Sequence, residues 1–272
     1  MSANNFHARL VLQYQEKADC ILMAYFATYL INLESSSERR TYAQSAMQAA
    51  NLKAQIIPAV DGRHRHATDF DIYDEGAAIT RHGRALIGGE VGCYLSHIAA
   101  IDAFLASNSQ FALVLEDDAT IPLDAKTFVS ALIDQIEISA PDWDIIHLSN
   151  TRSDFARDCF KIEGHLVRRS YFFPMVTTAL IWSRQGAQTF RNSRFGTSIR
   201  GPVDTELRSF CARRGRGFSL DAPPFPARPV ASDINTVHAH RRNGPRVGSP
   251  LKSKIMRHFP DYMATYWNML LR

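Results

Sequence analysis

The sequence predicts an α/β fold, a three-layer sandwich with a mostly parallel central sheet. Predicted strands and helices alternate through the first two thirds of the chain, which is the pattern of that architecture. The apolar run at residues 111–115 is typical of a buried central strand covered on both faces. With 272 residues, the chain can bury a sizeable core as one large domain or two small ones.

The individual elements follow from apolar periodicity, capping residues and turn residues. Serines precede the first helix and can cap it, and Asp61-Gly62 is a turn signal after the second strand. Gly88-Gly89 opens a helix with an apolar stripe at helical spacing. The predicted strands cover residues 25–33, 55–60, 111–115, 143–148, 165–172, 176–182 and 218–221. The predicted helices cover residues 38–51, 90–106, 123–139, 185–191, 202–214 and 251–271.

Three stretches are predicted to lack regular structure. Residues 62–87 are rich in His, Arg and Asp and suggest a long functional loop, and residues 150–164 suggest a second loop. Four prolines between residues 223 and 229 exclude regular structure there. Pro174 lies between two predicted strands and is compatible with a hairpin that joins them.

Composition and charge are ordinary for a globular enzyme, and the formal net charge is only +4. The positive charge is uneven, however, because residues 241–258 contain six Lys and Arg and no acid. Such a block is expected to attract phosphates or an anionic membrane, and we predict no nucleic-acid partner. The longest apolar run, residues 21–31, is far shorter than the ~20 residues of a membrane span. It also lacks the basic start and cleavage site of a signal peptide.

The cysteines bear on the cellular compartment. They are scattered at positions 20, 93, 159 and 211, with no CxxC pair and no metal-ligand spacing. This pattern predicts reduced thiols in a cytoplasmic protein.

Three adjacent carboxylates, Glu116, Asp117 and Asp118, follow the predicted central strand. In open α/β sheets, ligands bind at the carboxyl ends of the strands. Neighbouring carboxylates repel one another unless a cation or a proton lies among them. Hard cations such as Mg²⁺ and Mn²⁺ take carboxylate oxygens and leave positions for substrate phosphates. The stretch therefore predicts a metal–phosphate site, and the alternative is a solvated acidic turn.

Two further groups of residues are candidates for ligand binding. Arg39 and Arg40 fall in the first turn of a predicted helix, where cations are disfavoured, so they indicate an anionic ligand or else a solvated face. Glu90, Cys93 and His97 share one face of the next helix, because seven residues make about two turns. His97 is therefore a candidate ligand, with a structural role as the alternative.

Several sequence pieces occur together in a characteristic order. They are Ile31-Asn32-Leu33, Ala59-Val60-Asp61-Gly62, Gly89-Glu90-Val91-Gly92-Cys93 with Leu95-Ser96-His97, Leu115-Glu116-Asp117-Asp118, Trp143-Asp144-Ile145-Ile146, Thr178-Ala179 and Pro202-Val203-Asp204. In this order and spacing they resemble glycosyltransferase family 25, the sugar transferases of bacterial lipooligosaccharide and lipopolysaccharide synthesis. The resemblance covers roughly residues 28–210, and GEVGCYLSH followed by LEDD is its most specific part. We therefore expect an N-terminal extension at 1–24, a catalytic domain at 25–235 and a basic, amphipathic tail at 236–272.

The resemblance implies a GT-A-type fold, a UDP-sugar donor, usually UDP-galactose, and Mn²⁺ or Mg²⁺. It also implies a lipid-linked oligosaccharide acceptor and inversion to a β-linked sugar, so the enzyme would be a hexosyltransferase. The acidic stretch looks like the family's version of the DxD motif. By analogy Asp118 binds the metal and Glu116 reaches the ribose or a metal-bound water. His238 or His240 could complete the metal shell, or both could be residues of the tail.

Inversion requires a base that takes the acceptor's hydroxyl proton. Asp204 is the candidate base and Glu206 the substitute, while the alternative for Asp204 is a helix N-terminal acid that favours the helix dipole. By resemblance, Thr177 and Thr178 lie near the acceptor. The residues predicted to bind the donor are Asn32, Leu33, Arg39, Arg40, Asp61, Glu90, Ser96, His97, Glu116, Asp117 and Thr178.

Two other functions compete with sugar transfer. A nucleotidyltransferase also uses carboxylates and a metal, but the sequence lacks the Gly-rich, Lys-containing phosphate loop that we would expect of one. A catalytically silent binding protein on the same fold is the other alternative, since fold does not determine function.

The end of the chain predicts a membrane-surface helix. Its apolar residues recur at spacings of three and four and so share one helical face: Phe259, Tyr262, Met263, Tyr266, Trp267, Leu270 and Leu271. Together with the basic block, they predict reversible binding to an anionic membrane, on the inner leaflet of the bacterial inner membrane. The alternative is that the helix packs on the catalytic domain.

Overall fold

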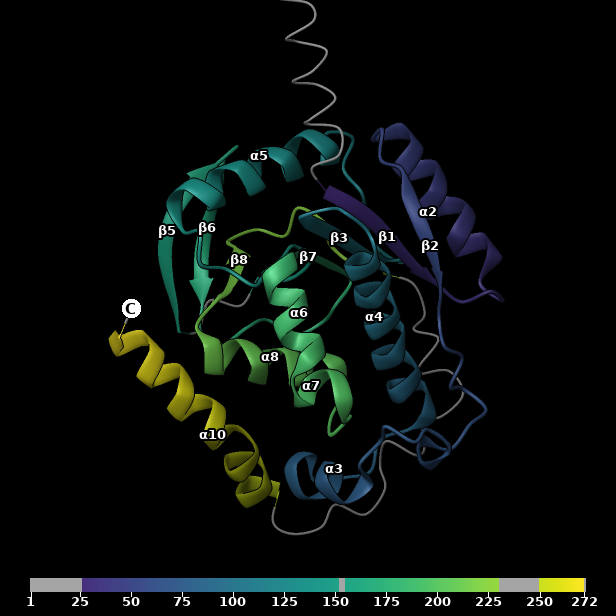
Figure 1. Ribbon diagram of the computed structural model, residues 1–272, viewed down its shortest axis with the longest axis vertical. Helices are drawn as coiled ribbons and strands as arrows, with labels where there is room; N and C mark the ends of the chain where they lie inside the picture. The colour runs from purple at the N-terminus through teal and green to yellow at the C-terminus, as the bar shows by residue number, and fades with distance from the viewer. Residues whose placement is uncertain (1–25, 152–154, 230–249, 272) are drawn as a thin grey trace, which may run out of the picture.

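A computed structural model describes residues 26–151, 155–229 and 250–271, with side chains described from Phe259 onward in the last range. Within these residues an eight-stranded sheet occupies the middle of the protein, in the order β2-β1-β3-β7-β4-β8-β6-β5 (Figure 1). The strands are β1 (Phe26–Asn32), β2 (Ala54–Pro58), β3 (Phe111–Glu116), β4 (Ile145–His147), β5 (Ala156–Ile162), β6 (His165–Ser170), β7 (Ala179–Ser183) and β8 (Gly217–Leu220). The predicted extension at 1–24 and the first part of the tail, 236–249, lie outside the described residues.

The sheet is mixed, so the prediction of a mostly parallel sheet is wrong. Among the described strands, β2-β1, β1-β3 and β4-β8 pair in parallel, whereas β3-β7, β7-β4, β8-β6 and β6-β5 are antiparallel. The polarity follows from the connections. Glu163 and Gly164, both at positive φ, join β5 to β6 in a two-residue turn, and such a turn can join only antiparallel neighbours.

Two expectations about this half of the sheet also fail. Residues 156–162 form a strand where we predicted a loop, and β6 and β7 do not form a hairpin. β6 pairs with β5 and β8, whereas β7 lies between β3 and β4. The strand was missed because β5 is largely exposed and polar, and so carries little apolar alternation.

Helices cover both faces of the sheet, which confirms the predicted three layers. Alternate residues of β3 point to opposite faces, so Ala112 and Val114 join one apolar cluster and Leu113 and Leu115 the other. The first cluster includes α3 (Glu75–His82), α4 (Gly88–Ala106), α6 (Arg184–Asn192), α7 (Arg194–Thr197) and α8 (Val203–Arg214). The second includes α2 (Ser37–Ala49) and α5 (Ala125–Ser139).

The region 62–87 is more ordered than we predicted. It contains a short 3-10 helix, η1 (Ala67–Asp69), and α3. The Asp74 carboxylate caps α3 by accepting a hydrogen bond from the Ala77 N–H at 2.9 Å, and Gly83 ends it at φ +80°. α3 is short and carries few apolar residues, so its periodicity is weak in the sequence.

Three glycines bring the turn after β2 into direct backbone contact with α4. A Cβ on Gly62 would lie 1.9 Å from the Gly88 carbonyl oxygen, and one on Gly92 would lie 2.4 Å from that of Val60. Only glycine fits such an approach. The Ser96 hydroxyl secures the contact by accepting a hydrogen bond from the Val60 N–H at 2.9 Å. The Asp61-Gly62 turn is thereby held beside α4.

The last helix, α10 (Pro250–Leu271), packs against α8 and α3 at the far side of the molecule from β2 (Figure 1). Within the described residues, no helix is both long and apolar enough to cross a membrane.

Candidate active site

A pocket lies at the carboxyl ends of the parallel strands β1, β2 and β3. The sequence-predicted residues that line it are Asn32, Leu33, Arg39, Asp61, Ser96, His97, Glu116, Asp117 and Asp118. Five other predicted residues are described by the structure but do not line this pocket: Arg40, Glu90, Thr178, Asp204 and Glu206. His238 and His240 lie outside the described residues. The pocket brings these side chains together, and the role of each stays a prediction.

Asp117 joins the ends of two strands and a helix. Its Oδ2 accepts a hydrogen bond from Asn32 Nδ2 at 2.6 Å, and its Oδ1 lies 2.6 Å from Arg39 Nη2. Asp117 is buried, so its charge needs such partners. Both oxygens of Asp117 therefore bind residues of the protein itself, and the contact with Oδ1 holds Arg39 at the pocket.

Glu116 is held by residues from two other elements. Its Oε1 lies 3.0 Å from His97 Nε2 on α4 and accepts a hydrogen bond from Thr177 Oγ1 at 2.6 Å. Burial raises the pKa of Glu116, but the hydrogen bonds and charge around it, led by those of His97, outweigh burial and lower it overall. Glu116 is therefore ionised at neutral pH. Cys93 Sγ, a ring nitrogen of His97 and a carboxylate oxygen of Glu116 also lie within 4.8 Å of one another.

Asp118 is the carboxylate best suited to bind a cation. Its Oδ1 is buried and has no hydrogen-bond partner among the described residues. Burial raises the pKa of Asp118 to about 6, and the charges of Glu116 and Asp117 add to the effect, while Arg39 opposes it. An unbonded carboxylate oxygen among other acids fits a hard divalent cation. Mn²⁺ or Mg²⁺ is thus compatible with these residues.

The raised pKa of Asp118 predicts a pH dependence of metal binding. Since the deprotonated carboxylate holds the cation, protonation competes with it below pH 6. We expect calorimetry to show Mn²⁺ affinity about tenfold weaker at pH 5 than at pH 7.5. In the metal-free protein, this group's contribution to stability is fully present below pH 3.8 and is lost as the pH rises through about 6. Equal Mn²⁺ affinity at the two pH values would contradict the assignment.

Asp204 lies in the first turn of α8. Its Oδ1 accepts a hydrogen bond from the Thr205 N–H at 2.7 Å. Burial raises the pKa of Asp204. Hydrogen bonds from the backbone of Thr205 and Val176 lower this pKa, but they do not outweigh burial. Burial also raises the pKa of the Cys93 thiol, with further contributions from the charges of Glu116, Asp204, Glu90 and Asp118. Asp204 therefore lies within electrostatic range of the residues around the pocket.

The segment at Val176 contacts both Asp204, the candidate base, and Glu116 of the acidic stretch. Val176 bonds Asp204 through its backbone, and the next residue, Thr177, donates to Glu116. The Val176 carbonyl lies 2.8 Å from His147 Nε2, and burial lowers the pKa of His147 to about 4, so this histidine is neutral. Val176 adopts φ +78°, which is strained for a β-branched residue. Such strain persists only where surrounding contacts hold it, and it clusters at functional sites.

Three of the predicted site residues, Glu206, Glu90 and Arg40, bind other parts of the protein outside the pocket. The fully buried Glu206 lies 2.5 Å from Arg194 Nη1 and 3.2 Å from Arg81 Nε. Glu90 forms a bidentate pair with Arg84 and accepts from the Ile87 N–H at 3.1 Å, which caps α4. Arg40 donates to the Glu34 carbonyl at 2.7 Å.

Thr178 contributes through its backbone, since its carbonyl accepts from the Glu116 N–H at 2.8 Å. This bond extends the β3–β7 pairing and fixes where Glu116 leaves the sheet.

Sequence reasoning missed Arg63. Its guanidinium lies 2.6 Å from Asp61 Oδ2 and donates to Ser35 Oγ at 2.7 Å. The hydrogen bond from Arg63 lowers the pKa of Asp61 to about 2. Arg63 thus adds a second arginine to the pocket wall beside Arg39. Its only sequence signal is its position directly after the Asp61-Gly62 turn.

Fold and pocket together define an α/β protein with a polar ligand site at the carboxyl ends of parallel strands. A family model described as "Glycosyltransferase family 25 (LPS biosynthesis protein)" matches residues 26–190. This chain belongs to glycosyltransferase family 25, as its motifs predicted. The match begins at β1 and includes the pocket, whereas Asp204 and α10 lie beyond its end.

Individual relatives agree with this assignment. "Procollagen galactosyltransferase 1-B" of Xenopus laevis is 30% identical over 192 residues, which are 68% of this chain and 31% of that protein. A "Glycosyltransferase 25 family member" of Anopheles gambiae is 34% identical over 131 residues, 46% of this chain and 22% of that protein. "Probable inactive glycosyltransferase 25 family member 3" of Bos taurus is 26% identical over 173 residues, 61% of this chain and 28% of that protein. The chain spans less than a third of the length of each of these relatives.

Proposed function

We propose that this protein is a metal-dependent, inverting glycosyltransferase with a GT-A-type fold, which transfers galactose from UDP-galactose to a lipid-linked oligosaccharide through a β linkage. The observation that carries the proposal is the unbonded, buried Oδ1 of Asp118 beside Glu116 in the pocket. The family description supports an acceptor of lipopolysaccharide synthesis, and the names of the procollagen galactosyltransferases support galactose. Such an acceptor would place the enzyme in the bacterial cytoplasm, at the inner leaflet of the inner membrane.

The donor would bind in the pocket of β1, β2 and β3. Asp118 would hold Mn²⁺ or Mg²⁺, with Glu116 close by, and the cation would supply positive charge to the leaving diphosphate. Asp117 is engaged by Asn32 and Arg39, so its contribution is to orient Arg39. Arg39 and Arg63 bring two guanidinium groups to the pocket wall, where they suit phosphate oxygens.

Asp204 would take the proton of the acceptor hydroxyl. Its pKa is raised by burial, which makes it a stronger base than an exposed aspartate. The N–H groups of Thr205 and Val176 orient its carboxylate. Val176 bonds Asp204 and Thr177 bonds Glu116, so the segment 176–177 would keep the base at a constant distance from the carboxylates that bind the donor.

A donor screen tests this function. Release of UDP from UDP-galactose, UDP-glucose and UDP-N-acetylglucosamine would be measured with and without Mn²⁺, using a lipooligosaccharide acceptor. We expect acceptor-dependent release from UDP-galactose, and a loss of at least ~10²-fold when EDTA removes the metal. Release that persists in EDTA would contradict the metal-dependent mechanism. Release from another sugar nucleotide alone would contradict the choice of galactose.

The second candidate is a catalytically silent binding protein on this fold. The bovine relative whose name describes it as inactive favours keeping this alternative. It predicts calorimetric binding of UDP with Mn²⁺ but no UDP release with any donor and acceptor. Turnover with one sugar nucleotide would exclude it.

A further inference from the structure

Helix α10 is docked to the rest of the protein through polar side chains and through the ring of Tyr262, which stacks on Phe172. Asp261, which is 1% exposed, accepts from Ser209 Oγ at 2.6 Å and lies 3.2 Å from Arg213 Nη1. Thr265 donates to the Tyr171 carbonyl at 2.9 Å, and Asn268 donates to the Ala212 carbonyl at 2.8 Å. Spacings of four and three place these side chains on one helical face. That face is turned toward α8, with Arg81 of α3 3.5 Å from Asp261.

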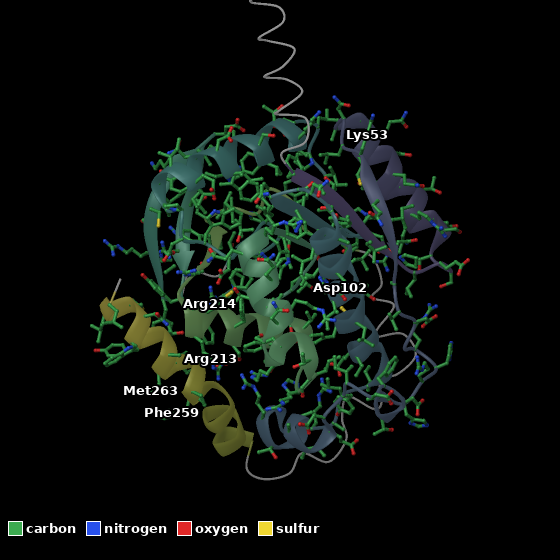
Figure 2. All side chains as sticks on the ribbon, in the orientation of Figure 1. Lys53, Asp102, Arg213, Arg214, Phe259 and Met263 are labelled. Carbon is green, nitrogen blue, oxygen red and sulfur yellow. The ribbon has the colours of Figure 1, made fainter. Side chains whose placement is uncertain are left out.

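Most apolar side chains of α10 are turned outward, as the labelled Phe259 and Met263 illustrate (Figure 2). They are between 39% and 66% exposed: Phe259, Tyr262, Met263, Tyr266, Trp267, Met269, Leu270 and Leu271. Tyr262 is partly exposed, but its ring also stacks on Phe172, with the ring centroids 4.8 Å apart. An amphipathic helix on a globular protein normally has the opposite arrangement. The seven residues that we predicted to share a face are thus all exposed. The alternative prediction, packing on the catalytic domain, also holds, through the polar side and the ring of Tyr262.

A contiguous apolar face of this kind marks an interaction site. The chain just before it supplies the second observation, because residues 241–258 contain Arg241, Arg242, Arg246, Lys252, Lys254 and Arg257 and no acid. Lys252, Lys254 and Arg257 belong to α10 itself, so two copies paired through this helix would bring like charges together, which disfavours self-association. An anionic partner complements the charge, and exposed Trp and Tyr suit the boundary between headgroups and acyl chains.

We propose that the outward face of α10 is a binding surface for an anionic lipid bilayer, with positive charge from Lys252, Lys254 and Arg257 earlier in the same helix. The helix would lie in the interface plane, its polar face still docked on α8 and its aromatic side chains among the headgroups. The proposal does not depend on sugar transfer. If transfer occurs, the surface would hold the pocket beside a lipid-borne acceptor.

Vesicle sedimentation of the full chain tests the surface, with vesicles of phosphatidylcholine alone or mixed with phosphatidylglycerol. We expect binding only to the mixed vesicles and release at about 1 M NaCl, where exposed charges are screened. The triple variant Tyr266→Ser, Trp267→Ser, Leu270→Ser should bind at least tenfold more weakly. The matched control is Leu123→Ser with Ile138→Ser, which removes side chains 77% and 78% exposed outside α10 and should bind as the unaltered protein does.

Tryptophan fluorescence gives a second measurement, which does not depend on sedimentation. Trp143 and Trp182 are each 1% exposed, whereas Trp267 is 63% exposed, so a change in environment should come from Trp267. We expect anionic vesicles to shift the emission to shorter wavelength, and Trp267→Phe to abolish the shift. Equal binding by the triple variant and the control, or no shift with bound vesicles, would overturn the proposal. So would dimerisation in the absence of lipid that the triple variant abolishes, because a second copy would then cover this face.

Discussion

Asp118→Asn should reduce sugar transfer by ~10²-fold or more, because it removes the charge that is expected to hold the divalent cation. The substitution keeps the shape of the side chain. It also removes a carboxylate whose burial raises its pKa, so the thermal stability of the metal-free protein at pH 7 should not fall. Initial rates with saturating UDP-galactose and Mn²⁺ measure the first effect, and calorimetric unfolding measures the second.

Asp124→Asn is the control for that experiment. Asp124 is the next acid along the chain, is exposed, makes no side-chain capping bond and does not line the pocket, so this variant should transfer sugar at the normal rate. Near-normal, Mn²⁺-dependent activity in Asp118→Asn would show that the metal is held elsewhere.

Asp204→Asn should lower the transfer rate by ~10²- to 10⁴-fold and leave donor binding intact, since a general base acts on the acceptor hydroxyl. Calorimetry with UDP and Mn²⁺ should give the same dissociation constant as the unaltered protein. Weakened UDP binding would instead make Asp204 a donor-site or structural residue.

Glu206→Gln separates the two candidate bases. Glu206 is fully buried between Arg81 and Arg194, so loss of its charge removes one ion pair from each arginine, although Arg81 keeps Asp261, and should lower the unfolding temperature. A stable Glu206→Gln protein without activity, together with an active Asp204→Asn protein, would transfer the role of base to Glu206.

Local sequence determined most of the strands and helices, though not β5 and α3, and it determined where the acids lie in the chain. The apolar run of β3 ends directly in Glu116, Asp117 and Asp118, so their place at the carboxyl end of a buried strand could be predicted from adjacent residues. The glycines of α4 were likewise visible in the sequence as a motif. The structure gives the reason for Gly92, because a Cβ there would meet the chain that follows β2. Periodicity also placed the apolar residues of α10 on one face. Propensity and spacing act over a few residues, which is why these features needed no tertiary information.

Tertiary structure decided how the acids are used and how the elements are oriented. Asp117 bonds Asn32 across 85 residues and Glu116 bonds Thr177 across 61, so no local pattern could show that Asp118 keeps an unbonded oxygen. The place of β7 between β3 and β4 likewise came from long-range pairing. For α10, spacing shows that residues share a face but not which face is turned inward. The partners of Asp261, Thr265 and Asn268 on α8 and at Tyr171 determine that, because a buried carboxylate or amide needs hydrogen bonds that only another part of the fold supplies.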